Sequence, residues 1–150
     1  MSRRNQIRLK EDEVRKYLEE SRTIILVSQG PAGYPHPMPM WFAVDDDGAI
    51  CMATYRSSQK VKNIQRDSRV SLLVESGAVY AELKGIVIYG HAEIIDDFER
   101  VVDVLLAAAG AESNESTRQG VSKTAAKRYL IRVKPERVVS WDHAKLGGIY

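Results

Sequence analysis

A run of hydroxyl and basic side chains occupies residues 57–69, with the sequence SSQKVKNIQRDSR. Ser57 and Ser58 come just before Lys60, and Val61 and Ile64 are spaced as on one face of a short helix. The first N–H groups of a helix lack partners and carry partial positive charge, so a helix start binds anions. The pattern predicts a phosphate site, and a solvated basic helix with an ordinary serine cap is the alternative interpretation.

The sequence offers few other residues for metal binding or for catalysis. The histidines His36, His91 and His143 are far apart in the sequence and share no metal-ligand spacing, so we expect no metal site. Neither a G-x-S-x-G nucleophile motif nor a Gly-rich Walker loop occurs. The single cysteine, Cys51, lies in the apolar run AICMAT, which predicts a buried and unreactive thiol. Any enzymatic chemistry is therefore expected to come from a cofactor.

The stretch MPMWF at residues 38–42 offers apolar surface for a planar ring. Trp41 and Phe42 are adjacent, so on a strand their side chains point to opposite sides of the sheet. We expect one of them in the core, while the other faces a ligand or a partner subunit.

The composition is that of an ordinary globular protein, with 44% hydrophobic and 28% charged residues in a chain of 150. This length predicts one domain over residues 1–150. A net charge of +2 excludes a general nucleic-acid binder, which carries a strongly basic face. No apolar run approaches the ~18 residues of a membrane span, and the charged start lacks the apolar segment of a secretion signal. We therefore expect a cytoplasmic protein that binds neither membrane nor nucleic acid.

Helices are predicted at 10–20, 58–66 and 97–109, where apolar residues recur with helical spacing. Alternating or β-branched segments predict strands at 22–28, 38–44, 49–55, 69–75, 79–94, 127–135 and 137–141. Gly85 and Gly90 predict bends or bulges in the long strand, DDDG at 45–48 predicts a hairpin turn, and 111–120 predicts a polar loop. Sequential hairpins with helices between them favour a mainly β fold, an antiparallel barrel of six to seven strands with short peripheral helices.

The order of these segments, with the motifs PHPMP at 35–39 and KVKNIQRDSRV at 60–70, resembles the FMN-binding split β-barrel superfamily of the pyridoxamine 5'-phosphate oxidase type. Within it, residues 10–140 are most similar to the branch that uses the deazaflavin coenzyme F420. The resemblance implies a split β-barrel and a homodimer with the cofactor at the subunit interface. The segment IRVKPERVVSW differs from the substrate-binding segment of true pyridoxamine phosphate oxidases, so vitamin B6 is not the expected substrate.

The resemblance also implies the cofactor-binding residues, in three groups. They are Met38, Pro39, Met40 and Trp41 beside the ring, with Thr54 at the end of the third strand; Ser57, Ser58 and Lys60 around the phosphate, followed by Asn63 in the same helix; and Tyr80, Lys84, Trp141 and Lys145 from the second subunit. Arg56, Lys62 or Arg66 is expected to supply a second cation. The tail SWDHAKLGG could equally be a strap that stabilises the dimer.

The implied activity is hydride transfer between reduced F420 and a conjugated small molecule, with no covalent catalytic residue. Tyr34, His36 and Tyr80 are candidate proton donors, and the loops 30–37 and 110–122 are expected to form the substrate pocket. The alternatives are an FMN-dependent oxidoreductase of the same fold, or a non-catalytic protein that binds a cofactor or a tetrapyrrole.

One feature of F420 separates it from FMN, namely a lactyl-oligoglutamate tail that favours extra cations outside the pocket. Arg3, Arg4, Arg8 and Lys10 could supply them, and a solvated basic tail is the alternative interpretation.

Overall fold

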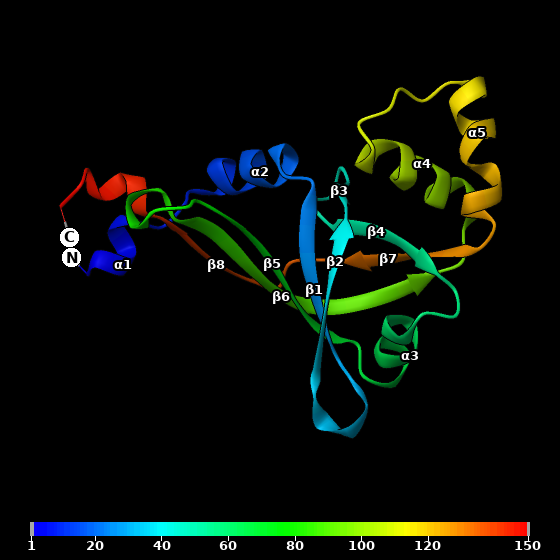
Figure 1. Ribbon diagram of the computed structural model, residues 1–150, viewed down its shortest axis with the longest axis horizontal. Helices are drawn as coiled ribbons and strands as arrows, with labels where there is room; N and C mark the ends of the chain where they lie inside the picture. Colours follow the sequence, from blue (N-terminus) through cyan, green and yellow to red (C-terminus); the bar gives the residue numbers. More distant parts are fainter. Residues whose placement is uncertain (1, 150) are drawn as a thin grey trace.

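The computed structural model describes residues 2–149 (Figure 1). The strands are β1 (Thr23–Gln29), β2 (Pro35–Trp41), β3 (Ala43–Val44), β4 (Ile50–Tyr55), β5 (Arg69–Ser76), β6 (Lys84–Ile95), β7 (Arg128–Val133) and β8 (Arg137–Asp142). The helices are α1 (Arg3–Gln6), α2 (Glu11–Glu20), α3 (Gln59–Arg66), α4 (Phe98–Ala108) and α5 (Glu115–Ala125). Short 3-10 turns are η1 (Pro31–Gly33), η2 (Tyr80–Glu82) and η3 (His143–Leu146).

The strands form an antiparallel sheet in the order β2-β1-β5-β6-β7-β4-β3, with β8 added to β6. The long strand β6 pairs with β8 over Lys84–Tyr89 and with β7 over Ala92–Ile95, so it belongs to both halves of the sheet. The sheet curls into a half-barrel, as predicted. The short β3 raises the number of strands to eight, because Phe42 separates it from β2.

The core lies inside this curl. Alternate residues of β1, such as Ile24 and Leu26, are fully buried, and they meet inward residues of β5 and β6 such as Leu72 and Ile88. A second cluster forms where α4 covers β4 and β7, and it includes Cys51. Cys51 is buried, as predicted, and burial and the Asp45 carboxylate raise the pKa of its thiol to about 11, which disfavours the reactive thiolate.

The polar loop predicted at 111–120 is wrong from residue 115 onward, because α5 begins there. The Asn114 side chain accepts a hydrogen bond from the Thr117 N–H at 3.0 Å and caps the helix. Arg118 then ties α5 to α4 through ion pairs with Glu99 and with Asp103, the latter at 2.6 Å. These contacts stabilise a helix whose serine, threonine and glycine residues have weak helical propensity of their own.

The long strand predicted at 79–94 begins only at Lys84, after η2. No bulge occurs at Gly85 or Gly90, because the pairing of β6 with β5 runs through both without a shift of register. Each glycine instead allows a close approach. A Cβ atom at Gly85 would lie 2.2 Å from the Trp141 ring, and one at Gly90 would lie 2.5 Å from the Lys134 carbonyl oxygen.

The molecule is elongated. Its accessible surface is 9045 Å², whereas a compact chain of 16.9 kDa exposes about 7,700 Å². An arm formed by α1, η2, η3 and the adjoining ends of β5, β6 and β8 projects from the barrel, at the left of Figure 1. Within residues 2–149, no helix is long and apolar enough to cross a membrane.

Candidate functional site

The helix start singled out in the sequence follows the end of β4. Ser58 is the N-cap residue of α3, but its hydroxyl makes no capping hydrogen bond and lies 3.3 Å from the Thr54 hydroxyl. Thr54 is itself buried. The first-turn N–H groups of α3 therefore receive no side-chain acceptor from the cap, and two hydroxyl groups lie beside them.

Lys60 is half-buried in the first turn of α3, and within residues 2–149 its ammonium group makes no ion pair or hydrogen bond. Burial lowers the pKa of its ammonium group, and the neighbouring Arg128 guanidinium lowers that pKa further. Arg128 opens β7 opposite Tyr55 and stacks over the Tyr55 ring at 4.0 Å. Two cations thus lie close together without a carboxylate partner in the described chain, and a bound anion would relieve their repulsion.

Arg128, the cation that lies beside Lys60, was not among the residues expected from the sequence. Of the expected candidates, Arg56 pairs with Asp96 at 2.5 Å and Arg66 donates to the Gln29 carbonyl oxygen, so both are engaged elsewhere. Lys62 is exposed. The pairing of β4 with β7 is what brings Arg128 to the site, and only the order of these strands in the sheet could have revealed it.

Asn63 anchors α3 to the barrel. Its side chain is fully buried, donates to the Ser28 hydroxyl at 3.0 Å and accepts from the Gln59 amide at 2.8 Å. This network fixes the direction of the helix axis, and so of the first-turn N–H groups. A direct contact between Asn63 and the cofactor stays a prediction.

The β2 residues divide between the two sides of the strand. His36, Met38 and Met40 are half-buried on one side, whereas the other side, with Pro39 and Trp41, is exposed. Trp41 is 56% exposed and lies under the Arg22 guanidinium at 3.9 Å, while Phe42 is 4% exposed in the core. The expected division of the Trp-Phe pair is confirmed, and a ring beside β2 would meet either the methionines or Trp41, not both.

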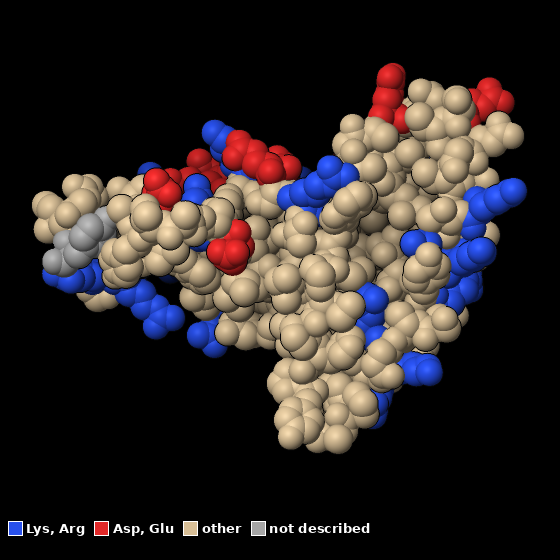
Figure 2. Space-filling model, in the orientation of Figure 1, with Lys and Arg blue, Asp and Glu red and all other residues tan. Residues whose placement is uncertain are grey.

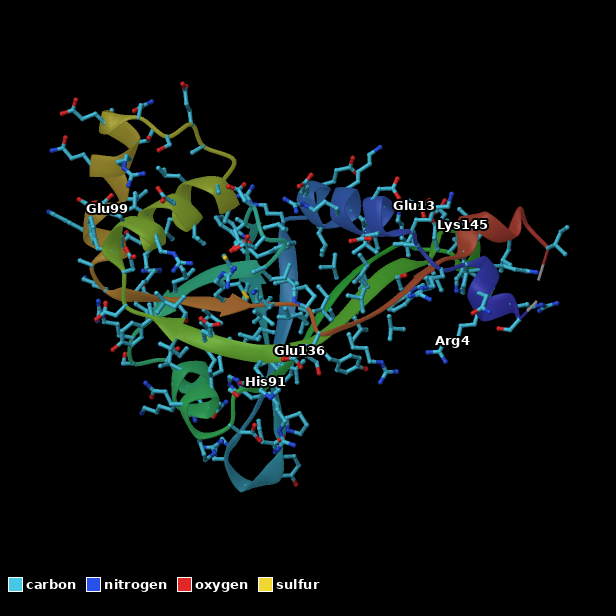
Figure 3. The ribbon with its side chains drawn as sticks, turned by 180° about the vertical axis from the view of Figure 1, so that it is seen from behind. Arg4, Glu13, His91, Glu99, Glu136 and Lys145 are labelled. Carbon is cyan, nitrogen blue, oxygen red and sulfur yellow. The ribbon has the colours of Figure 1, made fainter. Side chains whose placement is uncertain are left out.

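The third group of expected residues lies on the projecting arm, far from α3. The Lys84 ammonium is 3.6 Å from Asp142, and the Trp141 ring covers Gly85. Lys145 donates to Glu13 at 2.6 Å at the end of the molecule opposite α3 (Figure 3). The Tyr80 ring packs edge-on against His143 with 4.5 Å between ring centroids. One chain therefore does not bring this group to the phosphate residues, and its delivery by a second subunit stays a prediction.

Two of the cavities in the molecule lie away from the expected cofactor-binding residues, although Pro35 of the expected substrate loop lines the first of them. One, of about 510 Å³, lies over β1, β5 and β6, where His91 and Glu136 point toward each other with 2.7 Å between nitrogen and oxygen (Figure 3). The other, of about 740 Å³, lies between α2 and the turn from β3 to β4. Among residues 2–149, no group of three or more His, Cys, Asp or Glu side chains is arranged to hold a metal ion.

Comparison with known proteins agrees with the fold. A family model described as pyridoxamine 5'-phosphate oxidase matches residues 11–142. The crystal structure of the conserved hypothetical protein Rv2991 from Mycobacterium tuberculosis superposes with a TM-score of 0.91 at 35% identity, over 100% of this chain and 95% of that chain. None of the curated proteins compared with this chain matches it.

Two more distant structures share the fold. An F420 reductase superposes with a TM-score of 0.64 at 22% identity, over 82% of this chain and 93% of that one. HutZ, the haem storage protein from Vibrio cholerae, superposes with a TM-score of 0.67 at 16% identity, over 89% and 97%. At these identities the likeness is one of fold alone.

Proposed function

The chain belongs to the pyridoxamine 5'-phosphate oxidase family, and we propose that it is an oxidoreductase that uses F420, with hydride transfer between reduced deazaflavin and a conjugated small molecule. Lys60 carries this proposal. A half-buried ammonium beside a second cation, with no acid to balance either, fits a phosphate-bearing ligand.

The residues around α3 fit the phosphate of such a cofactor. The first-turn N–H groups and the hydroxyls of Thr54 and Ser58 can donate hydrogen bonds to it, and Lys60 and Arg128 can balance its charge. The Asn63 network holds these donors in place before the ligand arrives, which lowers the entropic cost of binding. When bound, the deazaflavin supplies the hydride chemistry, and the protein positions the ring and excludes water.

The charge around α3 favours F420 over FMN, which is the alternative. Figure 2 shows Lys and Arg side chains over α3 and the neighbouring edge of the barrel, while the acidic side chains on this face lie over α2 and the adjoining arm and around the outer end of α5. Lys62 and Lys127 are exposed and, within residues 2–149, make no ion pair. Such cations suit the carboxylates of an oligoglutamate tail, which FMN lacks. The N-terminal cations first considered for this tail lie on the arm, opposite α3, as Arg4 does in Figure 3.

A second copy of the chain would complete the site. The accessible surface of the chain exceeds that of a compact chain of the same mass by on the order of 1,000 Å². This excess is similar to the roughly 800 Å² that each partner buries in a standard interface. Trp41 and Tyr80 are 56% and 59% exposed and would become buried. We therefore propose a homodimer in which the arm of one subunit, with Lys84, Trp141 and Lys145, reaches the cofactor of the other.

The activity is tested by mixing the protein with reduced F420 and a panel of enones and conjugated ring compounds, and following reoxidation of the coenzyme by absorbance. The proposal predicts turnover with at least one electron-poor acceptor, and turnover that falls when Lys60 is replaced by methionine. Tight binding of F420 without oxidation by any acceptor would favour the non-catalytic alternative. Turnover with reduced FMN alone would assign the chain to the flavin-dependent members.

A further inference from the structure

The cavity between α2 and the turn from β3 to β4 is lined by none of the residues expected to bind a cofactor. Its volume is about 740 Å³, which is within the range of roughly 300–1,000 Å³ typical of small-molecule sites. No residue of α3 or β2 lines it, so the cavity is separate from the proposed phosphate site.

The floor of this cavity is aliphatic and reaches the main core. Ile88 is 1% exposed and Leu18 is 4% exposed, and both belong to the core cluster inside the curl of the sheet. Among residues 2–149, no aromatic side chain lines the cavity. A ligand would therefore bury an aliphatic surface against aliphatic side chains, and its affinity should grow with the area buried. The remaining apolar residues of the lining are the half-buried Val14, Val44 and Val138 and the exposed Pro135.

The rim of the same cavity is acidic. Glu11 and Asp12 come from the first turn of α2, and Asp46 and Asp47 come from the turn between β3 and β4. Acids at a helix start interact favourably with the helix dipole, and aspartate is common in turns, so each pair has a local reason to be acidic. Neither local reason explains why two segments more than thirty residues apart place their carboxylates around one aliphatic cavity.

The charge of the rim is not balanced by the protein. Arg15 is the one cation among the described residues of the lining, and it is already paired with Glu19 at 2.6 Å. Asp47 pairs with Arg132 at 3.1 Å. The other three carboxylates of the rim make no ion pair within residues 2–149, and they belong to Glu11, Asp12 and Asp46. A cation held between them would reduce their mutual repulsion.

We propose that this cavity binds an aliphatic primary amine, with the alkyl chain against the floor and the ammonium group among the carboxylates of the rim. The floor selects the chain through the apolar area that it buries. The rim selects the charge, because the same chain with a carboxylate head would meet acids that have no counter-ion. Since no aromatic ring is present to hold the cation, the carboxylates are the groups that bind it. The site does not depend on the proposed use of F420.

The first test is a calorimetric titration of the purified protein at pH 7 with butylamine, hexylamine and octylamine, and with octanoate as the control of opposite charge. Each added methylene group should strengthen binding of the amine by about fourfold, and octanoate should bind much more weakly than octylamine. Equal affinity for octanoate and octylamine, or no gain with chain length, would overturn the proposal. Spermidine bound as tightly as octylamine would also overturn it, because the site would then be a solvated acidic surface.

The second test locates the bound amine by NMR of methyl groups. Octylamine should shift the methyl signals of Val14, Val44 and Ile88, and should leave those of Val61 in α3 unchanged. Shifts confined to α3 or to other parts of the sheet would place the amine elsewhere and contradict the assignment.

The third test removes two charges from the rim, with the double substitution Asp12→Asn and Asp46→Asn. Both residues are exposed, so the fold should be kept, and the affinity for octylamine should fall roughly 3- to 30-fold. The matched control, Glu112→Gln with Glu115→Gln, removes two exposed acids at the start of α5, one of them also in the first turn of a helix. The rim has no role in binding if the first variant binds octylamine as the wild type does, or if the control loses as much affinity.

Discussion

The substitution Lys60→Met separates a binding role for this lysine from a structural one. Methionine keeps much of the length of the apolar stem, so it fills a similar volume in the half-buried position while it removes the ammonium group. The charge that it removes lies beside Arg128 and has no acidic partner within residues 2–149. The variant therefore loses a repulsion in the free protein, and loses an attraction only when an anion is bound.

The expected effects have opposite signs for stability and for binding. A charge-assisted hydrogen bond contributes about 1.5–3 kcal/mol, so the dissociation constant for F420 or FMN should rise roughly 10- to 150-fold. The midpoint of thermal unfolding without ligand should be equal to or higher than that of the wild type, because folding no longer buries an unbalanced cation. A residue kept for stability would show the reverse pattern.

Fluorescence titration and thermal unfolding of the same protein preparations measure both effects. Lys62→Met is the matched control, since it removes an exposed lysine from the same helix and should change the cofactor affinity much less. Lys60→Arg restores the charge and should recover part of the affinity. The reasoning is refuted if Lys60→Met binds as the wild type does, or if it loses stability and affinity together while Lys60→Arg recovers neither.

Further predictions concern pH and three other side chains. A bound phosphate stabilises the charged form of Lys60, whose pKa is lowered in the free protein, so cofactor affinity should be constant at neutral pH and fall as the pH rises through that lowered pKa. Because the Arg128 charge contributes to the lowering, Arg128→Gln should move this fall to higher pH. A pH profile of affinity that Arg128→Gln leaves unchanged would contradict the prediction. Cys51, with a pKa of about 11, should react with a disulfide reagent at pH 8 only on unfolding, and rapid reaction of the native protein would disprove its burial. The His36 Nδ1 atom is buried without a hydrogen-bond partner among the described residues, so the folded protein gains no hydrogen bond from it. His36→Phe should therefore leave the free energy of unfolding unchanged or higher. A loss above ~1 kcal/mol, measured by urea denaturation, would count against this prediction.

Local patterns in the sequence identified the parts of the site that lie close together in the chain. The spacing of Val61 and Ile64 after Ser58 predicted the helix α3, whose anion-binding start stays a prediction, and strand alternation predicted the opposite exposures of Trp41 and Phe42. The antiparallel fold followed from sequential hairpins and from the family resemblance, and both are confirmed.

The parts that were missed depend on contacts between distant segments. Arg128 reaches Lys60 only because β4 and β7 are neighbours in the sheet, which is not visible in the spacing of either segment. The helix α5 has weak intrinsic propensity, and its ion pairs from Arg118 to α4 are tertiary contacts. Gly85 was expected at a bulge because glycine is common there, whereas its actual role is to make room for Trp141.

A parallel titration of the purified protein with F420, FMN and riboflavin, followed by fluorescence, tests the central claim most directly. The account predicts that F420 binds more tightly than FMN, that riboflavin binds much more weakly than FMN because it lacks the phosphate, and that inorganic phosphate competes with both cofactors. Riboflavin binding as tightly as FMN would contradict a phosphate site at Lys60, and binding of none of the three would contradict the proposed function.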